Sequence, residues 1–164
     1  MEHLDETTIR SSFVNCSKGE AKRMNLPRDL GAVRWDDLDY LGWRDPQAPL
    51  RGYLVGRHEG EWRGIVLRAP ESVAGAGRRS MCNLCLTART GGVSLLVAPR
   101  AGRSGQKGDS VGTYVCEDLQ CSLYVRGRLS TGSVGMHETL PLEERIARLV
   151  DNVEVFIGRV LRAA

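Results

Sequence analysis

The sequence has no long apolar run and no recognisable export signal. Nowhere in the 164 residues do about 18 apolar residues follow one another, so no membrane-spanning helix is predicted. The N-terminal MEHLDETTIR is acidic and polar, whereas a secretory signal begins with a basic stretch followed by an apolar one. We therefore expect a cytoplasmic protein that does not enter a membrane.

The sequence also lacks the common motifs of catalysis and nucleotide binding. It has no glycine-rich phosphate loop ending in Gly-Lys-Ser/Thr, no dinucleotide fingerprint and no serine nucleophile elbow. A hydrolytic site could be assembled only from a few acids and one histidine, and these offer no pairing of a nucleophile with a base. They are Asp36, Asp37, Asp39 and His58. We expect a non-enzymatic protein without a small-molecule substrate, and an enzyme is the distant alternative.

Aromatic residues and excess charge are both scarce. Aromatic residues make up 5% of the chain, and the net charge is only +3 although 26% of residues are charged. Such mild basicity argues against a protein that coats nucleic acid, but it allows a local basic patch facing a protein factor or the ribosome. Apolar residues make up 41% of the chain, which is enough for one hydrophobic core but little for two. If the chain forms two small domains, each would need a metal or a docked helix for stability.

What the chain does contain is a pattern of cysteines. Cys82 and Cys85 form one pair, and Cys116 and Cys121 form a second pair beyond a Gly- and Arg-rich interval. Two cysteines separated by two residues can hold a metal ion from a tight turn, and a second pair can complete a tetrahedral thiolate site. We predict a structural Zn²⁺, because four thiolates leave no coordination position for a catalytic water. An iron site with the same ligands and a disulfide framework are the alternatives.

One cysteine stays outside this pattern, as do the histidines at positions 58 and 137. Cys16 lies near an apolar stripe and is expected to be a small buried side chain rather than a reactive thiol. His58 at a hairpin tip and His137 in a loop of Gly, Ser and Thr are expected to face solvent. Neither is needed beside four thiolates.

The N-terminal half predicts a helix, a compact turn and a hairpin. Residues 5–24 show helical spacing of apolar residues, with Asp5 as the N-cap. The aromatic and acidic stretch 34–46 predicts a turn pinned to the core. Residues 51–57 and 61–68 flank a short Gly-containing turn and predict a β-hairpin.

The C-terminal half predicts a second hairpin and two helices. Strands at 91–98 and 110–115 lie between the cysteine pairs, and a short helix beginning at Glu117 carries Cys121. Apolar residues recur at spacings of three and four over 142–161, which predicts a long amphipathic helix. We expect this helix to pack on the protein's own sheet or helices, and a face that binds a partner is the alternative.

Together these elements predict a fold of the α+β class. The order of knuckle, hairpin, strand and helix is that of a treble clef, which is a statement of fold and not of function. We expect a treble-clef zinc finger with antiparallel β-hairpins, an N-terminal helix and a long C-terminal amphipathic helix. A stretch rich in Gly, Ala and Pro at 69–80 marks a soft boundary between an N-terminal region, 1–77, and the zinc-finger region, 78–164.

Two stretches resemble a known family. MCNLC at 81–85 and GDSVGTYVCEDLQCSLYVR at 108–126 are similar to the C-terminal treble-clef zinc finger of the elongation factor G-binding (FBP) family, which includes the FusB-type fusidic acid resistance proteins. The resemblance covers about residues 80–130 and includes the uncommon gap of four residues within the second cysteine pair. RWDDLDYLGWRD at 34–45 looks like the shorter actinobacterial branch.

The resemblance implies a cytosolic protein that binds elongation factor G and helps it leave a ribosome stalled by the drug. It also implies that the zinc is structural and that the activity is protein binding. The implied zinc ligands are Cys82, Cys85, Cys116 and Cys121. The drug-resistance members carry a longer N-terminal helical bundle, whereas this chain has a helix, aromatic turns and a hairpin there.

A basic, glycine-rich loop between the second pair of strands is the candidate partner-binding surface. Its residues, with aromatic and basic neighbours near the metal, are Arg100, Arg103, Lys107, Tyr114, Tyr124 and Arg126. Basic and aromatic side chains on a rigid platform suit an acidic protein surface or ribosomal RNA. A zinc module that binds ribosomal RNA is therefore the alternative function, and a solubilising loop beside buried tyrosines is the third interpretation.

Overall fold

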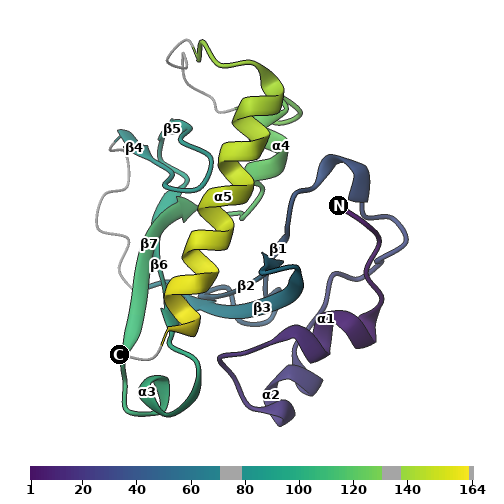
Figure 1. The fold of residues 1–164 in the computed structure, drawn as a ribbon, viewed down its shortest axis with the longest axis vertical. Helices are drawn as coiled ribbons and strands as arrows, with labels where there is room; N and C mark the ends of the chain where they lie inside the picture. The colour runs from purple at the N-terminus through teal and green to yellow at the C-terminus, as the bar shows by residue number, and fades with distance from the viewer. Residues whose placement is uncertain (71–78, 131–137, 163–164) are drawn as a thin grey trace.

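The computed structural model describes residues 1–70, 79–130 and 138–162 of the chain. A five-stranded antiparallel sheet lies at its centre, with a long helix on one face and two short helices on the other (Figure 1). This arrangement confirms the predicted α+β class, including the long C-terminal helix. No helix within the described residues combines the length and apolar character that crossing a membrane requires.

The sheet consists of two hairpins and one added strand, in the order β1-β2-β3-β6-β7. Its strands are β1 (Leu41–Arg44), β2 (Arg51–His58), β3 (Glu61–Arg68), β6 (Val93–Pro99) and β7 (Ser110–Cys116). Both predicted hairpins, β2–β3 and β6–β7, are confirmed. The sequence predicted only a compact turn at 34–46, but β1 lies within that stretch. It pairs with β2 over four residues, and three of the four are buried one after another, so no alternation of buried and exposed residues marks it as a strand.

The two hairpins meet at a single register pair, Arg68 with Val97. The predicted boundary between residues 1–77 and 78–164 falls in residues 71–78, which lie outside the described part of the chain. Strands from both sides of that boundary form one sheet.

The N-terminal stretch predicted as one helix contains two. Helix α1 (Glu6–Ser12) starts as predicted, since the Asp5 carboxylate accepts a hydrogen bond from Thr8 N at 2.7 Å. It ends because Phe13 leaves the helix to form a bridge with Gly64 of β3. Helix α2 (Lys18–Arg23) then begins with its own capping box. The prediction of one helix was wrong because a contact with the sheet outweighs local helix propensity.

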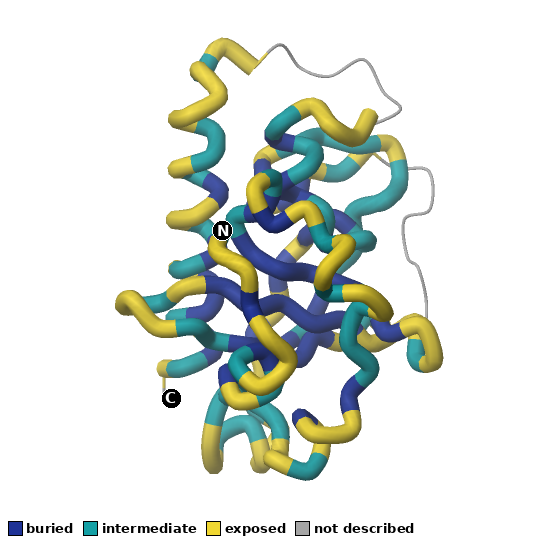
Figure 2. Tube along the Cα trace, turned by 90° about the vertical axis from the view of Figure 1, so that its right-hand side faces the viewer, coloured by how far each residue is buried: buried dark blue, intermediate teal, exposed yellow. Residues whose placement is uncertain are grey.

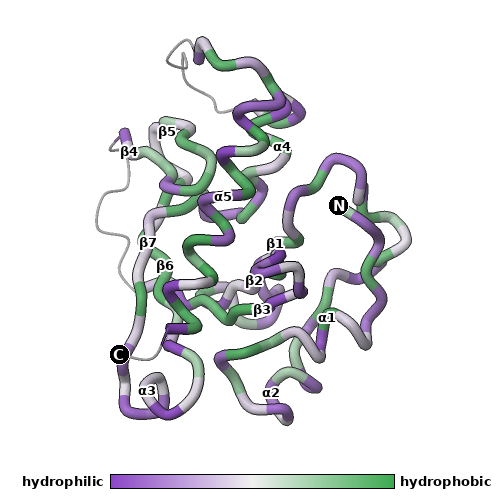
Figure 3. Tube along the Cα trace, viewed as in Figure 1, coloured by the Kyte–Doolittle hydropathy of each residue, from purple (hydrophilic) through white to green (hydrophobic). Residues whose placement is uncertain are grey.

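The long helix α5 (Leu142–Leu161) has the predicted bounds and packs on the sheet. Its buried side chains are Leu149, Val153, Phe156, Ile157 and Val160. They join the strand side chains and the four cysteines in one core cluster, and Trp35, Trp43 and Tyr53 belong to a second cluster with α1 and α2. The centre of the sheet is buried between these clusters (Figure 2), and hydrophobic and hydrophilic residues alternate along α5 (Figure 3).

Replacing Gly56 with valine is expected to destabilise the fold by about 2 kcal/mol, because over-packing a close contact costs on that scale. A Cβ at Gly56 would lie 2.9 Å from Val153 Cγ1 and 3.1 Å from Ile157 Cδ1, so α5 would have to move away from β2. Chemical denaturation measures the change. Gly112→Val on exposed β7 is the control, since the nearest atom there is the end of a flexible leucine; equal losses in the two variants would contradict the prediction.

Short elements surround the cysteines. Strands β4 (Arg79–Met81) and β5 (Ala88–Thr90) form a separate two-stranded ladder around the first cysteine pair. Helix α3 (Gly102–Gln106) lies in the loop between β6 and β7, and a 3₁₀ turn, η1 (Trp35–Asp37), precedes β1. Helix α4 (Cys121–Val125) begins at the last cysteine and not at Glu117 as predicted.

Candidate metal centre

Four buried cysteine sulfurs lie within 4.8 Å of one another. The Sγ atoms of Cys82 and Cys121 are 3.6 Å apart, and those of Cys85 and Cys116 are 3.7 Å apart. A tetrahedral Zn²⁺ with bonds of about 2.3 Å to sulfur requires sulfurs about 3.8 Å apart, so the donor set and spacing fit zinc. In the described part of the chain no other group of three or more His, Cys, Asp or Glu residues could hold a metal.

The first cysteine pair is a tight turn whose backbone points at sulfur. The backbone N–H groups of Leu84 and Cys85 donate to Cys82 Sγ at 3.4 and 3.5 Å. Leu86 closes the turn with a φ of 55° and an N–H bond to Cys82 O. Asn152 of α5 donates from Nδ2 to Leu84 O at 2.9 Å, so the long helix also fixes the turn.

The second pair sits where β7 ends and α4 begins. Leu119 reverses the chain between Cys116 and Cys121 with a φ of 59°, and its N–H donates to Cys116 O. This turn replaces the predicted first helical turn, because a left-handed residue ends helical continuity. The Leu119 carbonyl accepts a hydrogen bond from the buried Tyr40 hydroxyl at 2.8 Å. Burial, together with the charge of Cys121, raises the pKa of Tyr40 well above its ordinary value.

The four thiols cannot all ionise without a cation. Hydrogen bonds from Cys116 and Cys121 hold the pKa of Cys82 and of Cys85 below that of an ordinary thiol. Hydrogen bonds with Cys116, Cys82 and Cys85, together with burial, raise the pKa of Cys121. Since each thiolate hinders ionisation of the next, a bound dication is what allows four thiolates to share one buried site.

A basic side chain lies beside the sulfurs. Burial opposes the charge of Arg89, but the nearby Cys116 sulfur, Tyr124 and Asp118 more than offset this, and the pKa of Arg89 is raised. Its guanidinium lies 4.3 Å from the centroid of the Tyr124 ring and 3.7 Å from Asp118 Oδ2. A metal with four thiolates carries net charge −2, which Arg89 partly balances. The sequence prediction missed this role, because no spacing rule marks Arg89 as a neighbour of sulfur.

This geometry agrees with the comparison of the sequence with known families. The family model of the FBP C-terminal treble-clef zinc finger matches residues 8–160. The chain belongs to this family. The prediction made from two short stretches is thus confirmed over most of the chain, and a structural zinc at the four cysteines is supported by the donor set and by the family.

The fold of this FBP-family chain is also similar to a solved structure, that of the fusidic acid resistance protein FusC. The TM-score is 0.61 at 16% sequence identity, over 96% of this chain and 59% of FusC. The chain therefore spans less than two thirds of the length of FusC, and the likeness is one of fold. The comparison with curated proteins yields no match.

Three of the predicted partner-binding residues of this FBP-family chain are exposed. Tyr114 on β7 is 51% exposed. Arg103 on α3 and Lys107 at its C-cap are exposed at the loop between β6 and β7. These three side chains remain candidates for contact with a partner.

The other three predicted residues have partners within the fold. Arg100 Nη1 donates to Arg159 O at 2.5 Å and to Arg162 O at 3.1 Å, which satisfies carbonyls at the end of α5. The Tyr124 hydroxyl donates to Asp118 at 2.5 Å, and burial with this contact raises its pKa to about 12. Arg126 is paired with Asp39 through two hydrogen bonds.

Three of the four residues considered for a hydrolytic site have contacts within the fold. Asp39 pairs with Arg126, and Asp37 pairs with Arg34 at 2.5 Å. His58 at the end of β2 is half-buried rather than exposed, because it lies against Gly158 of α5. His137 lies outside the described residues. Cys16 is half-buried, and burial raises its pKa, as expected of an unreactive thiol.

Proposed function

We propose that this FBP-family chain is a non-enzymatic cytoplasmic protein that binds elongation factor G, with the zinc as a scaffold. The observation that carries the proposal is the full shell of four buried sulfurs, which leaves no coordination position for water or substrate. Activity must then come from a surface that the metal holds in place. The family resemblance of the cysteine stretches and the FusC-like fold support a translation factor as the partner.

The surface we assign to the factor lies next to the metal centre. Asn83 follows the first zinc ligand, and its N–H donates to Tyr114 O at 2.7 Å while its side chain reaches Thr113. The zinc turn therefore fixes the backbone beneath the exposed Tyr114 ring. Arg103 and Lys107 lie on the loop that closes the same hairpin. An aromatic anchor with flanking cations is a common composition for the centre of a protein interface.

Release of a factor stalled by fusidic acid is the finer part of the proposal. It rests on the FusB-type relationship, and the likeness covers 59% of FusC. A ribosome-release assay with the drug tests this part separately from binding.

Purified protein is expected to co-elute with elongation factor G at micromolar concentration and moderate salt. Removing the metal with a chelator should abolish co-elution, since the zinc turn positions the surface. If the metal-loaded protein does not co-elute with elongation factor G, the proposal is wrong. Capture of ribosomal RNA instead, with an affinity that falls steeply as salt rises, would support the alternative zinc module that binds RNA through the same exposed cations.

Reversing the charge of both Arg103 and Lys107 to glutamate is expected to weaken binding of elongation factor G by about tenfold or more, mainly through slower association. Both side chains are exposed, so the variant should keep its zinc and its thermal stability. Surface plasmon resonance measures the change. Arg28→Glu is the control, because Arg28 is also exposed but lies in a loop before β1; the same loss in the control would point to net charge rather than to this loop.

A further inference from the structure

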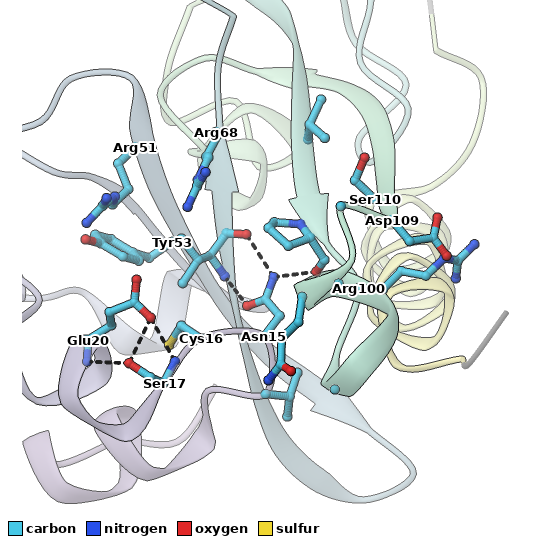
Figure 4. A pocket seen from close by; sticks show the side chains of 18 of the residues that line it. Asn15, Cys16, Ser17, Glu20, Arg51, Tyr53, Arg68, Arg100, Asp109 and Ser110 are labelled. Carbon is cyan, nitrogen blue, oxygen red and sulfur yellow. Dashed lines mark hydrogen bonds and ion pairs between the residues drawn. The ribbon is translucent and has the colours of Figure 1, made fainter.

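A pocket of about 670 Å³ opens on the sheet face that carries α1 and α2 (Figure 4). Its walls come from three separate parts of the chain. The junction of α1 and α2 forms one wall, the ends of β2 and β3 form the second, and the loop containing α3 forms the third. A volume in this range is typical of pockets that take a ligand or several partner side chains.

Two arginines stand side by side at the β2–β3 wall. Arg51 and Arg68 are direct cross-strand partners, and both side chains are exposed. Like charges at such positions destabilise a sheet unless something compensates them. No carboxylate of the described residues lies within ion-pair distance of either guanidinium, in contrast to Arg57 and Arg63 at the other end of the same hairpin, which pair with Glu2 and Glu61.

The acids that line the pocket are already engaged. Glu20 accepts hydrogen bonds from the backbone and the hydroxyl of Ser17, both at 2.9 Å. These bonds first, and the charges of Arg51 and Arg68 in addition, lower the pKa of Glu20. On the opposite wall Asp109 accepts from Ser104 at 2.6 Å and pairs with Arg100, so those two charges cancel.

The charge of the pocket can therefore be added up from its lining residues. Arg51 and Arg68 contribute two positive charges and Glu20 one negative charge, while Arg100 and Asp109 cancel. One positive charge remains. A carboxylate restores neutrality, whereas a phosphate monoester, with about −1.5 to −2 charges, would overshoot it.

The floor of the pocket is apolar, and hydrogen bonds hold its backbone. It is made by Val14, Met24, Tyr53, Val66, Val97 and Pro99. Asn15 fixes this floor where β3 and β6 diverge, because its amide accepts from Val66 N at 2.8 Å and donates to Val66 O and Pro99 O. A preformed floor lowers the entropic cost of binding.

We propose that this pocket receives an acidic segment of the protein partner, with one carboxylate clamped between Arg51 and Arg68 and a neighbouring apolar side chain on the floor. The inference rests on the proposed function, since it names the chemistry of the partner that this chain binds. The α3 wall continues into the exposed Arg103 and Lys107, so the pocket and the basic loop form one surface. Guanidinium groups suit this task because they bind carboxylates through two parallel hydrogen bonds.

The double variant Arg51→Glu/Arg68→Glu is expected to weaken binding of elongation factor G by about 100-fold or more, since it replaces two attractions with two repulsions. The matched control is Arg57→Glu/Arg63→Glu, which makes the same charge change at the other end of the hairpin and should alter affinity less than about threefold. Both variants should retain zinc and a cooperative thermal transition. Wild-type affinity in a folded Arg51→Glu/Arg68→Glu protein, or an equal loss in the control, would overturn the inference.

A second measurement tests whether the pocket binds carboxylates, even if elongation factor G does not bind the protein. A tetraglutamate peptide titrated into the zinc-loaded protein should shift the NMR signals of the Arg51 and Arg68 guanidinium groups, with a dissociation constant of about 1–10 mM, weak as expected for a single clamped carboxylate. The Arg51→Gln/Arg68→Gln variant should lose these shifts. No shift at the two arginines, or tighter binding there by inorganic phosphate than by the peptide, would overturn the proposal; failure of the factor alone to bind wild-type protein would overturn the proposed function.

Discussion

Cys116→Ser is expected to leave the protein without zinc and largely unfolded at 37 °C. The binding free energy of a structural zinc is on the order of 10 kcal/mol, comparable with the whole net stability of a domain. Cys116 ends β7, and its carbonyl closes the Leu119 turn, so losing the metal also loosens the contact with Tyr40. Zinc content per chain and thermal unfolding by circular dichroism measure the outcome.

Cys16→Ser is the matched control for this variant. Cys16 lies in the wall of the pocket, far in sequence from the metal, and is half-buried. The Cys16→Ser protein should keep one zinc per chain. Its free energy of unfolding should fall by about 1 kcal/mol or less, the common range for a mild change at a partly buried site. A strong chelator should reproduce the Cys116→Ser phenotype in the wild type and in the control. A chelated protein that retains its full thermal transition would show that the metal is not part of the fold's stability.

Arg126→Ala is expected to destabilise the protein by about 3–5 kcal/mol, because it leaves the buried Asp39 carboxylate without its partner. The two Arg126 Nη atoms lie 2.6 and 2.9 Å from the Asp39 oxygens, and the side chains are only 14% and 8% exposed. The pair joins the end of α4 to the segment before β1, so it connects the zinc finger to the first strand. We expect a melting temperature lower by about 10 °C for a chain of this size.

The neighbouring Arg128→Ala serves as the control. Arg128 is 57% exposed and lies 3.7 Å from Asp37, so its loss should change stability by less than about 0.5 kcal/mol. A double-mutant cycle with Asp39→Asn then measures the coupling within the buried pair. If Arg126→Ala instead kept full stability and lost only factor binding, Arg126 would be a partner contact, as the sequence first predicted.

The metal site was predictable because its information is local. Each cysteine pair lies within one turn, and spacing alone states which sulfurs can share an ion. The supports of that site come from far away in the chain, as with Tyr40, Arg89 and Asn152, and no local pattern reveals them. Sequence therefore predicts well which sulfurs lie together, and it predicts poorly the residues that orient them.

The hairpins and α5 were also predictable, whereas the breaks between elements were not. Alternation and helical spacing of apolar residues extend over whole elements, but α1 ends where Phe13 meets Gly64, a contact between distant residues.

The partner surface could not be predicted from local sequence either. In the sequence, Arg126 and Tyr114 are equally plausible partner-binding residues. The structure distinguishes them, because Arg126 is largely buried in an ion pair with Asp39 and Tyr114 is exposed.

The order of the elements along the chain also has a consequence for synthesis. Helix α5 covers the sheet face formed by Leu54, Ile65 and Leu96, yet it follows every strand in sequence. A chain emerging from the ribosome would expose that apolar face until residues 142–161 leave the exit tunnel, whereas α1 and α2 could cover the other face early. Since uncovered sheet faces promote aggregation, docking of α5 on β2 is the step at which the nascent protein becomes protected.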